Sequence, residues 1–225
     1  MSSYGPSGLS TWASSKRTMS SAGSWRASLS TAKLAETWVF KGGTCLRKCY
    51  YETFRFSEDL DFTIVTGGPD EPGDLNRIFG EIAEWLREES GIELALGANA
   101  FKRKRNRRGN ATTQGRIAYR GPNPPSVLPN AKIDITADEV LVHRPVRRPI
   151  GHQYSDTPLP VKGVRCYSLT ELFGEKLRAL TERCRPRDLY DVVHMHPLVT
   201  VQRGDRERVG EHAGASAAEA APAFR

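Results

Sequence analysis

Residues 37–65 read TWVFKGGTCLRKCYYETFRFSEDLDFTIV and combine two β-prone runs with a pair of glycines between them. Thr37–Lys41 is a short β-prone run closed by two glycines, which predicts a strand that enters a tight turn. A short helix is expected over Thr44–Tyr51 and a second strand over Leu60–Val65. The chain therefore starts its ordered part with a strand, a glycine turn, a helix and a strand.

The rest of the chain adds further elements. Apolar residues recur at helical spacing over Gly73–Glu89, which predicts an amphipathic helix lying on a sheet. A capping-box signature at Ser168–Glu171 predicts the start of another helix, and a further one is expected over Arg187–Met195. Strands are expected at Ile92–Leu96, Gly115–Arg120 and Lys132–Thr136. The sum is an α+β, or mixed α/β, fold.

The net charge of the 225 residues is +7, and it is unevenly distributed. Residues 1–100 have a balance of −3, whereas residues 101–225 have a balance of +10, so the two halves are expected to do different jobs. No apolar run approaches the roughly 18 to 20 residues of a membrane span. The N-terminus has no apolar signal region, so a cytoplasmic location without a membrane partner is expected.

Composition also divides the chain into segments. Residues 1–30 contain 11 serines and no periodic apolar pattern, which predicts a disordered leader. We expect a catalytic core over residues 31–165, a helical C-terminal part over residues 166–201 and a flexible tail over residues 202–225.

Four cysteines are too few for a disulfide framework in a chain of this length, and they indicate a reducing compartment. A zinc site is conceivable, with ligands drawn from Cys45, Cys49, Cys166, Cys184, His194 and His196. However, the sequence has no C-x-x-C pair, and small buried thiols are common in cores. Ordinary core cysteines are therefore the favoured interpretation.

Two carboxylates are expected side by side at the start of the second strand. Residues two apart in a strand point to the same face, so Asp59 and Asp61 would be neighbours. Such a pair repels unless a divalent cation neutralises it, and Mg²⁺ fits best. Asp134, on the polar face of a later strand, adds a third carboxylate. With the Gly-Gly-Thr turn, the pattern predicts a two-metal nucleotidyl-transfer site; a solvated strand end is the alternative for the aspartate pair.

Four separated segments resemble one protein family. The segments FKGGTCLRKCYYETFRFSEDLDFTIV, KIDIT, GEKLRAL and RPRDLYDVV resemble the AbiEii/AbiGii-type toxin nucleotidyltransferases, in the expected order and over about Leu34 to His196. That family is the toxin half of type IV toxin–antitoxin and abortive-infection systems. The resemblance implies a DNA polymerase β-like nucleotidyltransferase sheet with flanking helices and a short helical C-terminal part.

The resemblance also implies roles for individual residues. The nucleotide phosphates would be bound by Gly42, Gly43, Thr44 and Lys176. Asp59, Asp61 and Asp134 would hold Mg²⁺, with Asp134 placed to help deprotonate the attacking hydroxyl. Asp188 and Asp191 match acidic positions of the family, and a structural salt bridge is the alternative for both. Lys176 shares a helical stripe with apolar residues, so it either reaches a buried anion or extends out to solvent.

The segment FKRKRNRR carries six positive charges in eight residues. Such a concentration of like charge favours a polyanionic partner, most simply the phosphates of tRNA. The expected RNA contacts are Lys102, Arg103, Lys104, Arg105, Arg107 and Arg108. A basic hairpin without a ligand is the alternative.

Together these features predict Mg²⁺-dependent transfer of a nucleoside monophosphate from an NTP to a hydroxyl of tRNA. The resemblance implies a growth-inhibiting toxin with a transcriptional-regulator antitoxin encoded nearby. Transfer to a protein or small-molecule hydroxyl remains open. A further alternative is a catalytically impaired, truncated remnant that only binds RNA or a protein, because family members usually carry a longer helical C-terminal domain.

Overall fold

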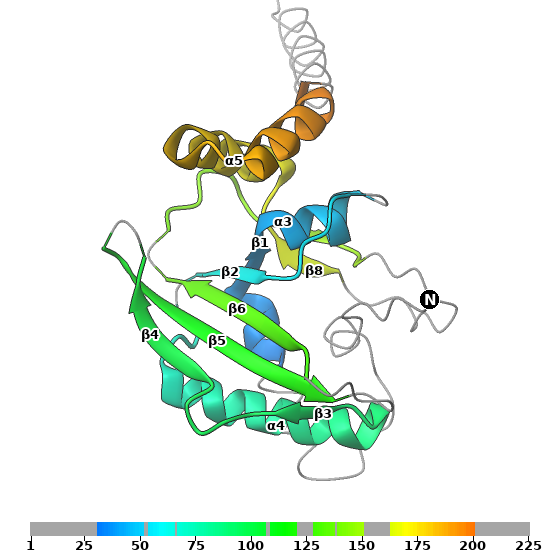
Figure 1. Cartoon of the computed structure of the whole chain (residues 1–225), viewed down its shortest axis with the longest axis vertical. Coiled ribbons are helices and arrows are strands. Elements are labelled where there is room, and N and C mark those ends of the chain that lie inside the picture. Colours follow the sequence, from blue (N-terminus) through cyan, green and yellow to red (C-terminus); the bar gives the residue numbers. More distant parts are fainter. Residues whose placement is uncertain are drawn as a thin grey trace, which may run out of the picture. The chain divides into compact units, whose positions relative to one another are not determined.

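The structure is a computed structural model that describes residues 31–51, 54–65, 67–106, 109–120, 128–137, 139–150 and 163–200. The chain divides into two compact units, Met1–Ser168 and Leu169–Arg225. The first contains a mixed β-sheet and the second is helical in its described residues (Figure 1).

The first unit is built on a sheet with the strand order β3-β5-β6-β2-β1-β8-β7, and β4 also pairs with β5. The strands are β1 (Trp38–Lys41), β2 (Leu60–Ile64), β3 (Glu93–Ala95), β4 (Phe101–Arg105), β5 (Ala111–Arg120), β6 (Asn130–Thr136), β7 (Val146–Arg148) and β8 (Val164–Cys166). Strand β2 is antiparallel to β1 and parallel to β6. The central strands β2 and β6 are thus neighbours although α4 and three strands separate them in the chain (Figure 1).

Helical segments connect and cover these strands. Residues 31–37 are helical, and α3 (Gly42–Cys45) with the π-helix η1 (Leu46–Tyr50) follows β1 directly. Helix α4 (Pro72–Ser90) has proline in its first turn, and Gly91 ends it in the left-handed conformation, with φ 70°. Both are favoured residues for those positions, because proline presets the helical φ and glycine tolerates a positive φ.

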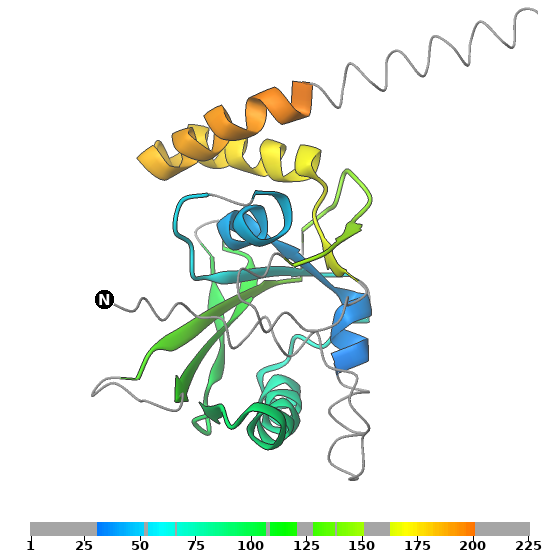
Figure 2. The ribbon, with the colours of Figure 1, turned by 90° about the vertical axis from the view of Figure 1, so that its right-hand side faces the viewer.

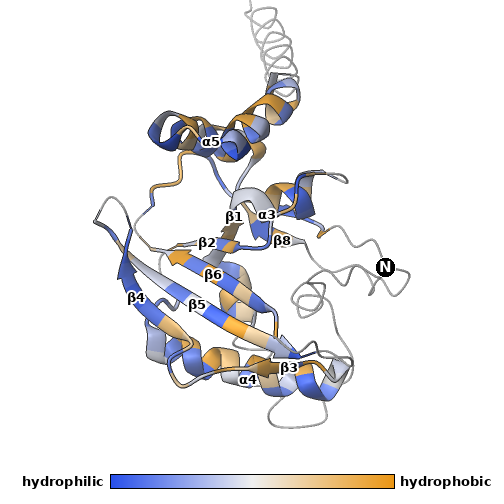
Figure 3. Ribbon diagram, in the orientation of Figure 1, coloured by the Kyte–Doolittle hydropathy of each residue, from blue (hydrophilic) through white to orange (hydrophobic). Residues whose placement is uncertain are grey.

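The hydrophobic core lies between α4 and one face of the sheet. Helix α4 contributes side chains including Leu75 and Ile82, which are at most 2% exposed. Strand β6 contributes Ile133 and Ile135 to the same cluster, so its polar side chains face the other way. Figure 3 shows this alternation as hydrophilic and hydrophobic bands along β5 and β6. The face opposite α4 is therefore left for polar chemistry.

The second unit consists, in its described part, of α5 (Leu169–Arg183) and a further helix over residues 186–200. The two helices lie side by side in Figure 2. The rings of Phe173 and His196 are 6.4 Å apart between centroids, which joins one helix to the other.

The predicted α+β class is confirmed, and the predicted β1, β2, β6 and α4 agree with the structure to within two residues at their ends. The sequence missed β4, β7, β8 and the helix over residues 31–37. The first compact unit ends at Ser168 and includes β8 with Cys166, whereas the core was expected over residues 31–165. The expected leader (residues 1–30) and tail (residues 202–225) lie outside the described residues.

Within the described part of the chain, none of the helices combines the length and the hydrophobicity that crossing a bilayer demands.

Candidate active site

The register of two parallel strands brings the predicted carboxylates together. Asp61 of β2 is paired with Asp134 of β6, and Leu60 is paired with Ile133. Register partners point to the same face of a sheet, so both aspartates stand on the face opposite α4. Asp59 precedes β2 by one residue and, like Asp134, forms an ion pair with Lys132.

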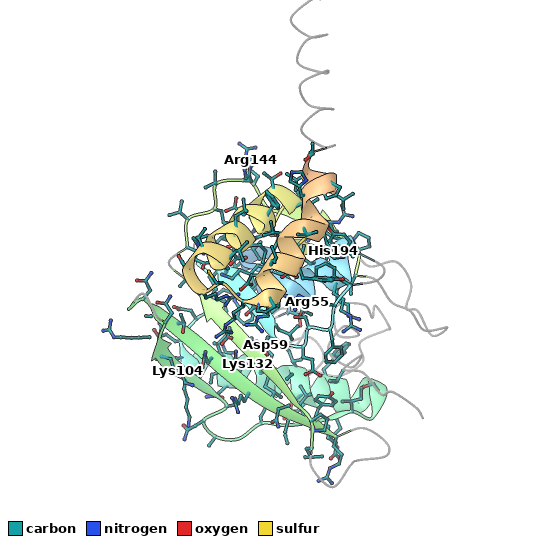
Figure 4. The ribbon with its side chains drawn as sticks, turned by 45° about the horizontal axis from the view of Figure 1, so that its top comes forward. Arg55, Asp59, Lys104, Lys132, Arg144 and His194 are labelled. Carbon is teal, nitrogen blue, oxygen red and sulfur yellow. The ribbon has the colours of Figure 1, made fainter. Side chains whose placement is uncertain are left out.

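Lys132 lies among these carboxylates. Its Nζ is 2.5 Å from Asp134 Oδ2 and 3.6 Å from Asp59 Oδ2, and Figure 4 shows Asp59 and Lys132 side by side. Partial burial alone would lower the pKa of Lys132. The hydrogen bond to Asp134 and the charges of the three aspartates outweigh this effect and raise the pKa above its ordinary value. Lys132 is therefore a protonated cation that partly neutralises the acidic cluster.

The first glycine of the Gly-Gly-Thr turn packs directly on Asp61. Gly42 has a φ of +77°, a conformation that residues with a Cβ rarely adopt. A Cβ atom at this position would lie 2.3 Å from Asp61 Oδ2. Both the backbone conformation and the contact therefore require glycine here.

The other two residues of the turn hold the loop that carries Asp59. The Thr44 hydroxyl donates to the backbone carbonyl of Asp59 at 2.6 Å, and its Oγ1 is also hydrogen-bonded to Ser57 Oγ at 3.0 Å. A Cβ at Gly43 would lie 2.9 Å from Arg55 Nη2 and from Ser57 Oγ. The Thr44 hydroxyl thus positions the Asp59 loop, and the predicted contact of Thr44 with a nucleotide phosphate stays a prediction.

A buried polar network lies on the same face of the sheet beside Asp61. Lys41, the register partner of Asp61, is 5% exposed and forms a salt bridge with Glu139. Glu139 also accepts hydrogen bonds from Thr63 Oγ1 at 2.7 Å and from the Tyr167 hydroxyl at 3.0 Å. Burial alone would raise the pKa of Glu139, but the charge of Lys41 and these hydrogen bonds lower it below its ordinary value.

The three aspartates offer carboxylate ligands to a divalent cation. Asp134 Oδ1 is buried and, among the described residues, has no hydrogen-bond partner. The Asp59 side chain is 51% exposed, so the cluster is open on one side. Carboxylate oxygens are the ligands that Mg²⁺ prefers, and a cation would satisfy the buried oxygen. Asp59, Asp61 and Asp134 are therefore the residues that would hold it.

In the second unit, Lys176 and the two late aspartates form ion pairs. Lys176 Nζ is 3.2 Å from Asp191 Oδ2, and both side chains are buried. The Arg183 guanidinium binds Asp188 in a two-pronged manner, with Nε and Nη2 each 2.7 Å from a carboxylate oxygen. Burial alone would raise the pKa of Asp188, but Arg183 lowers it. Each aspartate thus has its own cation.

The basic run forms β4 and is divided by the strand's alternation. Phe101 is buried against Phe79 of α4, with ring centroids 4.9 Å apart. Arg103 shares that side and binds Asp70 and Glu71 at 2.9 and 2.5 Å. Lys102 and Lys104 are exposed on the other side, the side of the carboxylates. Arg105 donates to the carbonyl of Gly109 at 2.8 Å, and Arg107 and Arg108 lie outside the described residues.

A groove of about 410 Å³ runs over β4, β5 and β6 beside the carboxylates. Four basic side chains line it: Lys102, Lys104, Arg116 and Lys132. The strand pairing aligns Lys102 with Gln114 of β5, and Gln114 with Asp134 of β6. The groove therefore extends from the exposed lysines of β4 to Lys132, which contacts the acidic cluster.

The family model for "Nucleotidyl transferase AbiEii toxin, Type IV TA system" matches residues 25–220. The chain belongs to the AbiEii family. No curated protein sequence matches it.

Two solved nucleotidyltransferases are similar to this AbiEii-family chain. MenT4, the nucleotidyltransferase toxin Rv2826c from Mycobacterium tuberculosis H37Rv, is 24% identical with a TM-score of 0.47, and the match covers 77% of this chain. The chain spans 60% of the length of MenT4. The antibiotic-resistance factor ANT(2'')-Ia is 13% identical with a TM-score of 0.34; the match covers 87% of this chain and 94% of that protein.

Several residues around the AbiEii carboxylates were not predicted as site residues. Lys132 could have been found, because it lies two residues before Asp134 and must share its strand face. Arg55 and Ser57 lie in an irregular loop without periodic pattern, and Glu139 acts from a segment after β6. Their contacts depend on tertiary folding, which spacing in the sequence does not reveal.

Substitution of Gly42 by alanine is expected to damage the site. The positive φ alone costs about 1–2 kcal/mol for a residue with a Cβ, and the new methyl group would displace the Asp61 carboxylate. Urea unfolding should show this loss, and Mg²⁺ binding should weaken. The control is Gly80→Ala in α4, where nothing lies near the new Cβ and a gain of about 0.5–1 kcal/mol is expected. Equal behaviour of the two variants would contradict the tight packing at Gly42.

Substitution of Lys41 by methionine should destabilise the chain in a pH-dependent way. It leaves the Glu139 carboxylate buried without its cation, at a cost of roughly 3 kcal/mol at pH 7. In the wild type, the lowered pKa of Glu139 stabilises the fold above its ordinary value of 4.5, and this stabilisation is lost as the pH falls through the folded pKa. In the variant, burial raises the pKa of Glu139, so protonation at acid pH removes the cost of burying an unpaired carboxylate.

Urea unfolding from pH 7 to pH 4 should therefore show a stability gap between wild type and Lys41→Met that narrows toward acid pH. The double variant Lys41→Met/Glu139→Gln removes both charges and should recover much of the loss at pH 7. A gap that stays constant over this range would contradict the assigned ion pair.

Proposed function

We propose that this chain transfers a nucleoside monophosphate from an NTP to a hydroxyl of tRNA and so inhibits growth as the toxin of a type IV toxin–antitoxin system. The observation that carries this proposal is the pairing of Asp61 with Asp134. Gly42 packs directly on Asp61 and has a positive φ that residues with a Cβ rarely adopt. Membership of the AbiEii family supports the reaction class.

In the proposed reaction, the acceptor hydroxyl oxygen forms a bond to the α-phosphorus of the NTP. The bond to the bridging oxygen breaks, and pyrophosphate leaves. Mg²⁺ held by the three aspartates would neutralise phosphate charge that develops during transfer. The Asp134 carboxylate would accept the proton of the hydroxyl.

The turn and its loop would position the nucleotide. The backbone N–H groups of Gly43 and Thr44 are the proposed phosphate contacts, because the Thr44 hydroxyl already holds the Asp59 loop. Lys132 would supply positive charge beside Asp59 and Asp134. In the second unit, Lys176 is buried in an ion pair with Asp191, and its contact with the triphosphate stays a prediction.

The basic groove is the proposed binding site for the acceptor strand. Lys102, Lys104 and Arg116 line it and lie on the carboxylate face of the sheet. A row of cations that leads toward a catalytic centre suits a phosphate backbone, since each neutralised phosphate adds affinity. We further propose that the chain acts in the cytoplasm, where NTPs and tRNA are available, and is opposed there by a cognate antitoxin.

The reaction is tested with labelled NTPs, Mg²⁺ and total tRNA. Asp61→Asn and Asp134→Asn should each lower label transfer by at least about 100-fold, because they remove carboxylates that hold the cation. Asp74→Asn is the matched control, since Asp74 is an exposed carboxylate on α4 and its side chain is 59% exposed. Expression in a bacterial host should arrest growth with wild type and control only.

Other outcomes separate the competing functions. Label that moves to a protein or a small molecule, and not to tRNA, would assign a different acceptor to the same site. Wild-type protein that binds tRNA but transfers no label to any acceptor would contradict the enzymatic proposal and indicate a binding protein.

The groove proposal predicts a difference between the two sides of β4. Lys102→Ala/Lys104→Ala should weaken tRNA binding and lower the slope of log K against log salt by about 2, or about 1 per lost phosphate contact. Arg103→Ala/Arg105→Ala removes the same charge from the same strand but from groups held by Asp70, Glu71 and Gly109. Its effect on the slope should be less than half as large.

Fluorescence anisotropy with labelled tRNA between about 50 and 200 mM salt measures both slopes. Equal slopes for the two double variants would show that the carboxylate face is not the RNA-binding face.

A further inference from the structure

Three of the four cysteines meet in the interior of the first unit. Cys45 ends α3, Cys49 lies in η1, and Cys166 ends β8, 117 residues later. All three are at most 5% exposed, and their sulfur atoms all lie within 4.8 Å of one another. Cys184, by contrast, is exposed and belongs to the second unit.

The backbone presents the two helical cysteines together. A residue and the fourth residue after it lie on one face of a helix, and here the segment also contains a π-turn, in which the Tyr51 N–H donates to the Leu46 carbonyl at 3.0 Å. π-Helical turns are rare in proteins, and many of those that occur lie at functional sites. Both sulfur atoms therefore point toward the same partner strand, where Cys166 lies.

A cation and a phenol lie beside the three thiols. Arg148 donates from Nε to the Cys49 carbonyl at 2.6 Å, and its guanidinium lies 4.4 Å from the centre of the Tyr50 ring. The Tyr50 hydroxyl is 4.0 Å from Cys166 Sγ. Hydrogen bonds from Cys45 and Cys49 lower the pKa of Cys166, and Arg148 acts in the same direction. Burial raises the pKa of Cys45, and the hydrogen bond to Cys166 raises the pKa of Cys49, so negative charge in the cluster resides on Cys166.

The sulfur spacing suits a metal ion. Zinc–thiolate bonds of about 2.3 Å place sulfur ligands about 3.8 Å apart in a tetrahedral site and about 4.0 Å apart in a trigonal one. The sulfur atoms are at most 4.8 Å apart, so binding would require any two of them to approach each other by no more than about one ångström. Thiolates select soft cations such as Zn²⁺ and Cu⁺, whereas the Mg²⁺ site offers only carboxylates.

We propose that Cys45, Cys49 and Cys166 bind one thiophilic metal ion, Zn²⁺ or Cu⁺, as a structural site separate from the Mg²⁺ site. Binding replaces the thiol protons, which are released to solvent, and leaves the sulfur oxidation state unchanged. Arg148 offsets part of the negative charge of three thiolates. Cys45 directly follows Thr44, so the ion would tie the glycine turn and its helix to β8.

The test uses the full chain carrying Cys184→Ser, in which the three clustered thiols are the only ones. The protein is produced in cells grown with added zinc or with added copper and purified under reducing conditions, and its metal content is measured by mass spectrometry. We expect one equivalent of metal per chain, and comparison of the zinc-grown with the copper-grown protein identifies the ion. A chelator should lower Tm by roughly 5–10 °C if the metal is present at about 100 times its Kd.

Cadmium provides a second readout, because refolding with Cd²⁺ should produce the ultraviolet charge-transfer band of a cadmium thiolate. Cys49→Ser and Cys166→Ser, each in the same background, should lose the band and the bound metal. Their circular dichroism shows whether they fold. The proposal is overturned if the background protein holds no stoichiometric metal in either arm and gives no cadmium band. An intact mass lower by two hydrogens, which indicates a disulfide, would also overturn it.

Discussion

The parallel pairing of β2 with β6 is the constraint on which the rest of the site depends. It places Asp61 directly opposite Asp134, and two like charges at this spacing repel each other. The same register places Leu60 opposite Ile133 and Phe62 opposite Ile135, with the isoleucines in the core against α4. The apolar face therefore fixes a register that the polar face alone would disfavour, because a slip of one residue would bury the aspartates.

The surroundings of the carboxylates compensate for this unfavourable pairing. Lys132 supplies a cation from the same strand as Asp134, and the glycine turn leaves room for the Asp61 side chain. Beside them, Lys41 and Glu139 form a salt bridge in which the lysine is buried. One charge pair is thus satisfied within the fold, and the excess negative charge is concentrated where a metal ion can bind.

The sequence predicted those parts of the site that follow from local periodicity. Alternation was enough to place Asp59, Asp61 and Asp134 on one face, and the helical pattern located α4. It could not find β7 and β8, which are three residues long, or β4, which is charged at four of its five positions and so lacks an alternating apolar signal. Contacts between distant segments were also hidden: nothing near Cys45 indicates that Cys166 lies beside it.

The basic run illustrates why charge in a sequence differs from charge on a surface. Its residues are consecutive, but strand alternation sends Arg103 toward Asp70 and Glu71, where its charge is neutralised and anchors β4 beside the start of α4. Lys102 and Lys104 keep their charge exposed on the face that carries the aspartates. The anchoring arginine is what presents the two lysines there, since it fixes which side of β4 faces the helix. In β4, therefore, part of the positive charge is neutralised within the fold, and only the remainder is available to a partner.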